Sequence, residues 1–339
     1  MERKVFIKVK DKVINHIQIE IVLRNHGVKL SKLVTKGIDV GTDELKMLKI
    51  ICRSKVPESK IISNITWLRR RKRNNGRHSE FIEDFKTKTH WFIVFEFPRT
   101  TLQDILSSAE MVPLPDRHVR EMISQITSAV LSLHKESIMH LDIQPQSIEI
   151  VNAATGKEFV YQRNSKFIEK GMQVKNTNAA AAMIDIEHRK WYLVNFWRFA
   201  RWASRFRSDN FSIGCLFWEM IKGQSMFLAC DVDDRMYRKA KAHMFTAILG
   251  YFPDDMRIRI SMSCQGIFKR GTDELEDLSD LPTAIQEYLR NCSELEASFD
   301  DEDILDVTRA LTHLSPKQRP PLENVLCFRS FQFEEGVVE

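Results

Sequence analysis

A change in the spacing of apolar residues near residue 98 constrains the fold of this chain more than any other feature. Before it, residues 91–97 form an unbroken run of aromatic and β-branched side chains closed by Pro98, which predicts a buried strand. After it, apolar residues recur at steps of three and four over 119–133, which predicts a long amphipathic helix. The strand-like pattern before this point and the helical pattern after it predict two lobes, residues 1–97 and residues 98–335.

The first part is expected to be a small, β-rich domain. Apolar and polar residues alternate over Val5–Val9 and Ile17–Val22, as they do in half-buried strands. Residues 43–52 carry Leu45 and Leu48 at helical spacing, so a short amphipathic helix is predicted there.

The second part is expected to be larger and helical. Residues 211–221 are apolar almost all round, which predicts a helix buried in the core and stopped by Gly223. Residues 152–182 are polar and predict an insertion between two strands. Further helices are predicted over 283–292, 301–313 and 321–327.

Composition excludes several classes of protein. Among the 339 residues 43% are hydrophobic and 29% charged, which excludes a disordered chain, and no apolar stretch approaches the ~20 residues of a spanning helix. Six scattered cysteines without a C-x-x-C pair predict neither a disulfide framework nor a zinc site. The net charge of +5 does not by itself indicate nucleic acid. An intracellular protein without a membrane partner is expected.

Four segments, in this order, resemble motifs of one family. Residues 140–148 (His-Leu-Asp-Ile-Gln-Pro-Gln-Ser-Ile) resemble the catalytic loop of protein kinases, and residues 193–200 resemble the strand and metal-binding D-F-G segment. Residues 209–215 resemble the start of the central buried helix, and residues 315–320 the closing D-P-x-x-R motif. The resemblance covers residues 27–333 and implies an α+β, two-lobed protein kinase-like fold with a small β-rich N-lobe and a larger helical C-lobe.

A subfamily is indicated by three further segments. Residues 93–97, the insertion at 152–182 and residues 248–256 (Ile-Leu-Gly-Tyr-Phe-Pro-Asp-Asp-Met) are similar to LAMMER-type (Cdc-like) dual-specificity kinases and their splicing-factor kinase relatives. The LAMMER signature itself is not kept, because residues 241–246 stand in its place.

The Gly-rich loop that covers the phosphates in kinases is missing, so the N-lobe is read as truncated. The first 75 residues contain only Gly27, Gly37 and Gly41, none at G-x-G-x-x-G spacing. Backbone amides cannot approach a phosphate closely where side chains intervene. We expect this chain to bind nucleotide more weakly than kinases that have the loop.

The resemblance also implies which residues would hold a nucleotide. The phosphate-binding lysine is assigned to Lys29, with Lys32 as the alternative, and its helical glutamate partner to Glu44. Glu96 falls at the end of the strand beside the nucleotide position, while Glu149 replaces the apolar residue under the adenine ring. A carboxylate there would be desolvated and repelled by phosphates.

The catalytic and metal positions are degenerate. Asp142 matches the residue that accepts the substrate proton, although it is also read as a structural residue of its loop. Gln144 replaces the lysine that stabilises the transferring phosphate. Ser147 and Asn195 replace the metal-binding Asn and Asp.

Other matches indicate a preserved scaffold. Leu48, His140 and Phe196 match packing positions that link the lobes, with His140 read as a satisfied core histidine, and Asp209 matches the anchor of the catalytic loop. Arg319 matches the arginine that pairs with the glutamate of an A-P-E-like motif. That motif is absent, because only eight residues separate Ala200 from Asp209.

Two charged segments allow alternative readings. Arg69–Arg73 is a basic run expected in a surface loop between strands, either a nuclear-import or nucleic-acid patch or simply a solvated loop. The acidic residues of 294–306 either dock basic, Arg-rich partners or belong to a helix start.

The function predicted first is that of a pseudokinase, a catalytically impaired kinase-like module that binds or regulates a protein partner. No cofactor is expected for it. The alternative is a divergent LAMMER-like kinase with residual ATP- and Mg²⁺-dependent transfer to Arg/Ser-rich proteins, in which Lys29, Glu44, Asp142 and Asn195 carry the chemistry. A third hypothesis, a sensor that binds ATP without transfer, is opposed by Glu149. Arg/Ser-rich proteins are the candidate partners, nucleic acid is not indicated, and the nucleus is favoured over the cytoplasm.

Overall fold

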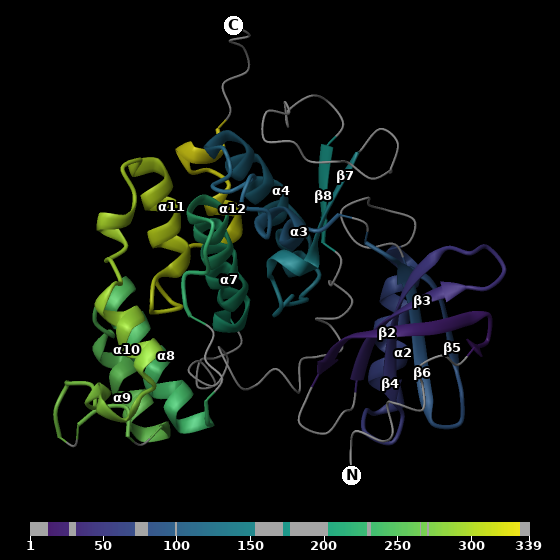
Figure 1. Ribbon diagram of the computed structural model, residues 1–339, viewed down its shortest axis with the longest axis horizontal. Helices are drawn as coiled ribbons and strands as arrows, with labels where there is room; N and C mark the ends of the chain where they lie inside the picture. The colour runs from purple at the N-terminus through teal and green to yellow at the C-terminus, as the bar shows by residue number, and fades with distance from the viewer. Residues whose placement is uncertain are drawn as a thin grey trace, which may run out of the picture. The chain divides into compact units, whose positions relative to one another are not determined.

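The structure is a computed structural model, and it describes nine stretches of the chain: residues 13–26, 32–71, 81–98, 100–152, 172–176, 203–228, 232–264, 266–269 and 271–332. The chain divides into two compact units (Figure 1). The first unit comprises Met1–Ser107 and Glu136–Tyr192, and the second comprises Ser108–Lys135 and Leu193–Glu339. This division differs from the lobes 1–97 and 98–335, whose limits stay a prediction.

The first unit is built on a six-stranded antiparallel sheet with the strand order β1-β2-β3-β4-β6-β5. The strands predicted over 17–22 and 91–97 are confirmed as β2 and β6, whereas Val5–Val9 lies outside the described residues. The strands are β1 Val13–Ile14, β2 Ile17–His26, β3 Lys32–Asp39, β4 Leu45–Cys52, β5 Phe81–Lys86 and β6 His90–Glu96.

The helix predicted over 43–52 is wrong, because this segment is the central strand β4. In the antiparallel register Lys49 lies opposite Val34 of β3 and Ile93 of β6. Residues 47–51 are all buried, which a strand covered on both faces requires and a one-sided amphipathic helix does not. A short apolar run does not distinguish the two by periodicity alone.

The helix that precedes β5 is α2, Glu58–Arg71, and it covers one face of the sheet. Ile61, Ile65 and Leu68 of α2 pack in one cluster with Met47 and Ile51 of β4. The opposite face of the sheet carries a second cluster, formed by Ile17, Ile19, Leu48, Ile50, Phe92 and Val94. Strand alternation therefore places Leu48 and Lys49 of β4 on different faces.

The basic run at 69–73 does not begin in a loop as predicted. Arg69–Arg71 form the last turn of α2, and Lys72 and Arg73 lie outside the described residues. Basic side chains are favourable at the C-terminal end of a helix, where the unpaired carbonyls lie.

A short hairpin completes the first unit. Strand β7, Ile148–Asn152, pairs antiparallel with β8, Met172–Asn176, so a strand lies within the insertion predicted over 152–182. The helix α3, Leu102–Leu106, begins at a capping box formed by Thr101 and Asp104. The loop that resembles the kinase catalytic loop ends in the 3₁₀ turn η1, Pro145–Ser147, directly before β7.

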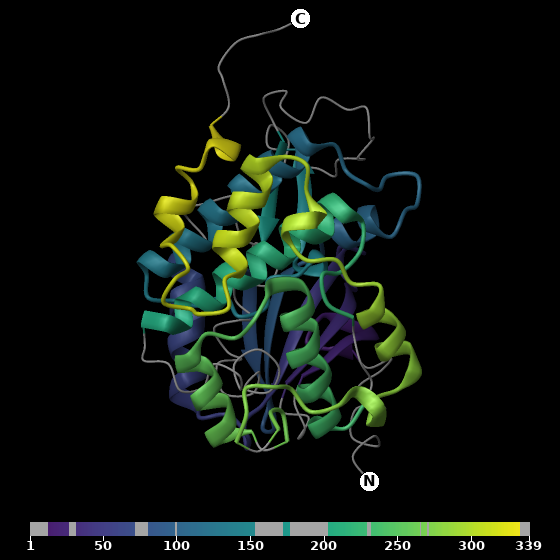
Figure 2. The ribbon, with the colours of Figure 1, turned by 90° about the vertical axis from the view of Figure 1, so that its left-hand side faces the viewer.

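The second unit is helical (Figures 1 and 2). The helices predicted over 119–133, 283–292, 301–313 and 321–327 are confirmed as α4, α10, α11 and α12. The predicted buried helix is α7, but it begins before residue 211. The elements are α4 Asp116–Lys135, α7 Ala203–Lys222, α8 Asp234–Leu249, α9 Asp254–Ser263, η2 Leu278–Asp280, α10 Thr283–Arg290, η3 Glu296–Ser298, α11 Glu302–Thr312, α12 Leu322–Val325 and η4 Arg329–Phe331.

Helix α7 forms the core of the second unit and packs against both α4 and α11. Phe211 and Phe217 of α7 are fully buried, which explains the apolar character of this helix on all sides. At Gly214 a Cβ atom would lie 2.6 Å from Cγ2 of Thr312 and 2.9 Å from Cβ of Leu311, so only glycine allows α11 to approach this closely. Within the described part of the chain, no helix has the length and apolar character needed to span a membrane.

Candidate functional site

The loop that resembles the kinase catalytic loop is held together by its own side chains. Asp142 is 9% exposed, and its Oδ1 accepts a hydrogen bond from Nε2 of Gln144 at 2.7 Å. The preceding residue, Leu141, has a positive φ of 60°, a conformation that is uncommon for a residue with a side chain. The carboxylate at the position of the proton acceptor is thus engaged by a neutral amide.

Ser147 is fully buried and closes the same loop from its far end. Its hydroxyl lies within hydrogen-bond distance of the carbonyl oxygens of Asp142, at 2.8 Å, and Gln144, at 2.7 Å. Oγ of Ser147 also accepts the N–H of Gln144 at 3.1 Å. The residue at the position of the metal-binding Asn is therefore committed to backbone groups.

His140 holds the backbone of Asp142 by a hydrogen bond. It is fully buried, and its Nδ1 accepts the N–H of Asp142 at 3.1 Å. A histidine that is buried and hydrogen-bonded in this way acts as a core residue.

The predicted metal position, Asn195, and the packing residue Phe196 both lie outside the described residues. Among the residues that the structure describes, no group of three or more His, Cys, Asp or Glu side chains is arranged to hold a metal ion. No geometry for a metal ion follows from this part of the chain.

The structure describes only some of the residues predicted to hold a nucleotide. Lys29 lies outside the described residues, between β2 and β3, and Lys32 is the first residue of β3. Glu44 precedes β4 instead of starting a helix; it is exposed, and its Oε2 lies 2.6 Å from Nζ of Lys46. Glu44 is therefore not the helical glutamate that was predicted.

The remaining acidic candidates lie at the ends of strands. Glu96 ends β6, is exposed, and lies opposite Lys46 in the register of β4 and β6. Glu149 is half-buried on β7, opposite Lys175 of β8.

Asp209 lies in the second unit, on α7. Its carboxylate is fully buried, and Oδ2 lies 2.8 Å from Nε2 of His134 on α4. The ring of His134 packs edge-on against Phe206, with 4.9 Å between ring centroids. Asp209 thus links two central helices of its unit.

Arg319 is 1% exposed, and its guanidinium is held by backbone carbonyls. It donates to the oxygens of His313 and Arg207, each at 2.7 Å, and to that of Leu314 at 3.1 Å. The guanidinium also lies 4.8 Å above the ring of Phe211. Burial lowers the pKa of Arg319 to about 9, which still leaves the guanidinium charged at neutral pH.

A comparison with protein families agrees with this geometry. The sequence model of the protein kinase domain matches residues 31–330 of the chain. The chain belongs to the protein kinase family.

The similar proteins include dual specificity kinases and a serine/threonine-protein kinase. This kinase-family chain is 22% identical to dual specificity protein kinase lkh1 of Schizosaccharomyces pombe, over 87% of this chain and 41% of that protein. It is 24% identical to human dual specificity protein kinase CLK4, over 73% of this chain and 51% of CLK4. For serine/threonine-protein kinase AFC1 of Arabidopsis thaliana the identity is 23%, over 86% of this chain and 62% of AFC1. The chain thus spans about half the length of these relatives.

The fold agrees as well. The crystal structure of the kinase domain of PF14_0431 matches with a TM-score of 0.69, covering 95% of this chain and 97% of that one at 14% sequence identity. At this identity the match shows the kinase fold and nothing finer. The predicted fold class is confirmed, with an antiparallel sheet in the N-lobe and helices in the C-lobe.

In a kinase fold the phosphate-binding lysine lies on the strand that precedes the first large helix, and the corresponding residue is one that the sequence analysis missed. Lys49 lies in the middle of β4, the strand before α2, and is only 3% exposed. Lys46-Met47-Leu48-Lys49 resembles the V-A-I-K motif of such strands. The prediction of a helix over 43–52 concealed this signal.

The partner of such a lysine is a glutamate on the helix, and α2 does not supply it in the usual place. The sequence of α2 contains one carboxylate, Glu58, in its first turn. Its oxygens lie 3.2 Å from Arg53 and 3.2 Å from Lys86, and hydrogen bonds from these two cations lower the pKa of Glu58. On the face of α2 that carries Ile61, Ile65 and Leu68, the polar residue is Asn64.

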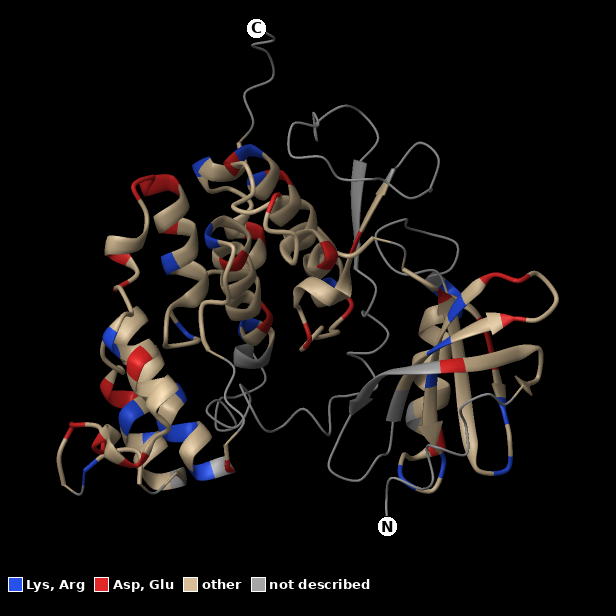
Figure 3. Cartoon of the chain, viewed as in Figure 1, with Lys and Arg blue, Asp and Glu red and all other residues tan. Residues whose placement is uncertain are grey.

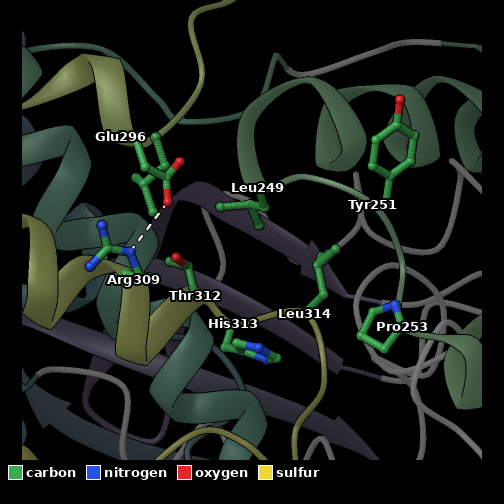
Figure 4. A pocket seen from close by; sticks show the side chains of 9 residues that line it. Leu249, Tyr251, Pro253, Glu296, Arg309, Thr312, His313 and Leu314 are labelled. Atoms are coloured by element: carbon green, nitrogen blue, oxygen red, sulfur yellow. Dashed lines mark hydrogen bonds and ion pairs between the residues drawn. The ribbon is translucent and has the colours of Figure 1, made fainter.

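The second unit contains a pocket of its own (Figure 4). Some of its polar side chains have partners: Arg309 pairs with Glu296 at 3.2 Å, and Thr312 donates to the carbonyl of Thr308 at 2.7 Å. The pocket is lined by Leu249, Tyr251, Pro253, Leu295, Glu296, Arg309, Thr312, His313 and Leu314. It combines apolar side chains with the ionisable groups of Glu296, Arg309 and His313, and none of the predicted catalytic residues lines it.

Proposed function

We propose that this kinase-fold chain is a binding or regulatory module that does not transfer phosphate. The observation that carries the proposal is the 2.7 Å hydrogen bond from Nε2 of Gln144 to Oδ1 of Asp142. A kinase uses the carboxylate at this position to accept the proton of the substrate hydroxyl, and cations to balance the charge of the moving phosphoryl group. A glutamine contributes a dipole but no charge, so the transition state loses electrostatic stabilisation.

The two metal positions support the same proposal. Magnesium favours oxygen ligands in octahedral geometry and is held in kinases by an Asp and an Asn. Ser147, at one of these positions, is buried and bonded within its loop, and Asn195, at the other, has no charge. Neutral and already engaged ligands would hold Mg²⁺ weakly, so we propose that no cofactor is required.

The proposal is tested by two measurements on the purified chain. Thermal melts with ATP, with and without Mg²⁺, should show no rise in melting temperature. Binding at 100 times the dissociation constant would add ~2.7 kcal/mol of stability, which is easily detected. Transfer of radiolabelled phosphate to an Arg/Ser-rich peptide should not exceed that of the Asp142→Asn variant. Steady transfer by the unmodified chain, abolished in Asp142→Asn, would refute the proposal.

One observation favours a second candidate, a divergent LAMMER-like kinase with residual activity. Asp142 is retained, and Lys49 is buried on the strand where a kinase carries its phosphate-binding lysine. In this case ATP and Mg²⁺ would be the cofactors and Arg/Ser-rich proteins the substrates. Lys49 would then take the role first assigned to Lys29.

The partner of the module is proposed to be a protein, with Arg/Ser-rich segments as the candidate class and the nucleus as the favoured location. Acidic residues gather at the start of α11 (Figure 3), where Asp301 caps the helix and pairs with Arg120 at 2.5 Å. Glu302 and Asp303 lie in the first turn, so the helix-start reading of this tract is confirmed for these residues. Glu296 and Asp306 of the tract pair with Arg309, so we propose the exposed Glu294, Asp300 and Glu302 as the contacts for a basic segment.

A further inference from the structure

The outer side of α2 forms one wall of a surface groove in the first unit. Ser63, Thr66, Trp67 and Arg70 line it from the helix, at steps of three and four residues. Glu136 and Ile138, which follow α4 in sequence, form the other wall. The groove has a volume of about 440 Å³, which is large enough for two or three side chains of a peptide.

Three polar side chains on the helical wall, Ser63, Thr66 and Arg70, make no side-chain contact with a polar group of the described residues. Within the described part of the chain, the guanidinium of Arg70 has no hydrogen bond or ion pair, whereas its neighbour Arg69 lies 2.6 Å from Asp84. Ser63, Thr66 and Arg70 are all exposed. Three donors, one of them a cation, therefore face solvent along one side of the groove.

The apolar side chains of the groove, Ile138 and Trp67, are held in place. Ile138 is 8% exposed, and Trp67 packs against the core cluster beneath α2. The indole N–H of Trp67 donates to the carboxylate of Glu136, which holds the ring in place. A rigid aromatic wall next to an exposed arginine is typical of sites that anchor one side chain of a partner.

The charge of the region limits what can bind. The sequence of α2 contains four basic residues and one acidic residue, and Lys72 and Arg73 follow it directly. Ser63 and Arg70 are seven positions apart, about 10 Å along the helix, or about three residues of an extended chain. We propose that this groove binds an acidic protein segment in which an apolar side chain is flanked by Asp or Glu residues.

A protein segment fits the groove better than a nucleic acid does. Nucleic acids bind through several phosphates at once, but the groove offers one unpaired cation, Arg70, and its opposite wall carries the carboxylate of Glu136. The Trp67 ring packs against the core and its N–H is bonded, so it does not stand free to stack on a base. The inference goes beyond the proposed function, because it adds an acidic partner segment to the Arg/Ser-rich one proposed above.

The test is fluorescence anisotropy with the full chain and a labelled twelve-residue peptide in which one leucine is flanked by four glutamates. Arg70→Glu should weaken binding at least tenfold, because it replaces the unpaired cation by a like charge. Thr66→Trp should also weaken binding at least tenfold, because the larger side chain fills the groove without changing the charge.

Each variant has a matched control on the same chain. Arg117→Glu makes the same charge change at an exposed position of α4, and Ile62→Trp adds the same side chain on α2 outside the groove. Both controls should bind the peptide within twofold of the unmodified chain. All four variants should keep its far-UV circular dichroism spectrum and melting temperature.

Three results would overturn the inference: no peptide binding by the unmodified chain at millimolar concentration, equal weakening by Arg117→Glu and Arg70→Glu, or tighter and Arg70-dependent binding of a twelve-residue oligothymidine. The test is independent of phosphate transfer. Lack of peptide binding by a chain that transfers no phosphate refutes the groove alone. Peptide binding by a chain that transfers phosphate refutes the proposed function alone.

Discussion

The side-chain amide of Gln144 donates a hydrogen bond to the carboxylate of Asp142, with 2.7 Å between Nε2 and Oδ1. Together with the contacts of Ser147 and His140, this bond satisfies the polar groups of the loop without any ligand. A loop stabilised in this way does not need nucleotide or metal to become ordered. Substitutions in this loop should therefore change phosphate transfer and the free energy of unfolding independently of each other.

Restoring one catalytic residue should not restore phosphate transfer. Gln144→Lys returns the cation beside Asp142, but Ser147 and Asn195 still replace the metal ligands. One electrostatic contact of this kind is worth ~3–4 kcal/mol of barrier, or ~10²–10³ in rate, so the remaining losses dominate. Radiolabel transfer to an Arg/Ser-rich peptide should stay at background. A single reversion that gives transfer, abolished by adding Asp142→Asn, would contradict this expectation.

Asp209 and His134 should be energetically coupled. Asp209→Ala leaves the imidazole nitrogen of the half-buried His134 without its acceptor, and should cost about 1–3 kcal/mol of unfolding free energy. In a double-mutant cycle with His134→Ala, urea melts should give an interaction energy of about 0.5–3 kcal/mol. Asp116→Ala, at an exposed position of α4, should cost less than ~1 kcal/mol and serves as the control. Additive effects of the two buried changes would show that the contact stabilises nothing.

Arg319→Lys should destabilise the second unit although it keeps the charge. The guanidinium reaches the carbonyls of His313, Arg207 and Leu314 at once, which the single amine of lysine cannot do. A buried carbonyl left unpaired costs ~1–3 kcal/mol, so a loss of at least about 2 kcal/mol is expected in chemical denaturation. The same change at the exposed Arg290 should stay within about 0.5 kcal/mol. Equal losses at both positions would mean that the three carbonyl contacts are not needed.

Gly214→Ala should be destabilising, against the usual preference of helices for alanine. Replacing a helical glycine by alanine normally gains ~1 kcal/mol. Here the new Cβ would meet Thr312 at 2.6 Å and Leu311 at 2.9 Å, and overpacking typically costs about 1–3 kcal/mol. The steric term should win, giving a net loss that thermal and urea melts can measure. Ser212→Ala, on the same helix, is the control, and a stabilising Gly214→Ala would show that α11 moves away freely.

Stability should fall as the pH drops below neutral, in part through His243. Burial lowers the pKa of His243, whose Nε2 lies 2.8 Å from the carbonyl of Glu276. The folded state therefore disfavours the protonated ring. The contribution of His243 to stability is fully present above its unfolded pKa, ~6.5, and is lost as the pH falls through its lower folded pKa. His243→Gln, which does not titrate, should reduce the slope of melting temperature against pH between pH 7.5 and 5.5. An unchanged slope would assign the acid sensitivity to other groups.

Much of the fold could be predicted because many of its helices bury apolar residues on a single face. The apolar stripe of α4 has a single buried face, so periodicity alone identifies the helix. Strand β4 is buried on both faces, and its continuous run of apolar residues fits either element. That ambiguity also concealed Lys49, because a lysine in a surface helix is ordinary while one in a central strand is not.

The candidate site was predictable in position but not in its contacts. The order of motifs along the sequence placed Asp142, Gln144 and Ser147 in one loop. Motifs do not specify side-chain rotamers, so the bond between Gln144 and Asp142 had to be seen in the structure. Likewise, Arg319 was expected to lack its glutamate, and the structure shows that backbone carbonyls hold it instead.

The early start of α7 has a consequence for control in the cell. Residues 203–208, which follow the D-F-G-like segment, form the first turns of this helix, and the carbonyl of Arg207 among them holds Arg319. The resemblance to kinases implies a segment several times longer here, one that can be rearranged to turn an enzyme on or off. Residues 203–208 are instead helical, and they belong to a helix that packs in the core of the second unit. We expect the amount of partner bound by this protein to depend on how many copies of the protein are present. We do not expect it to depend on a rearrangement of this segment.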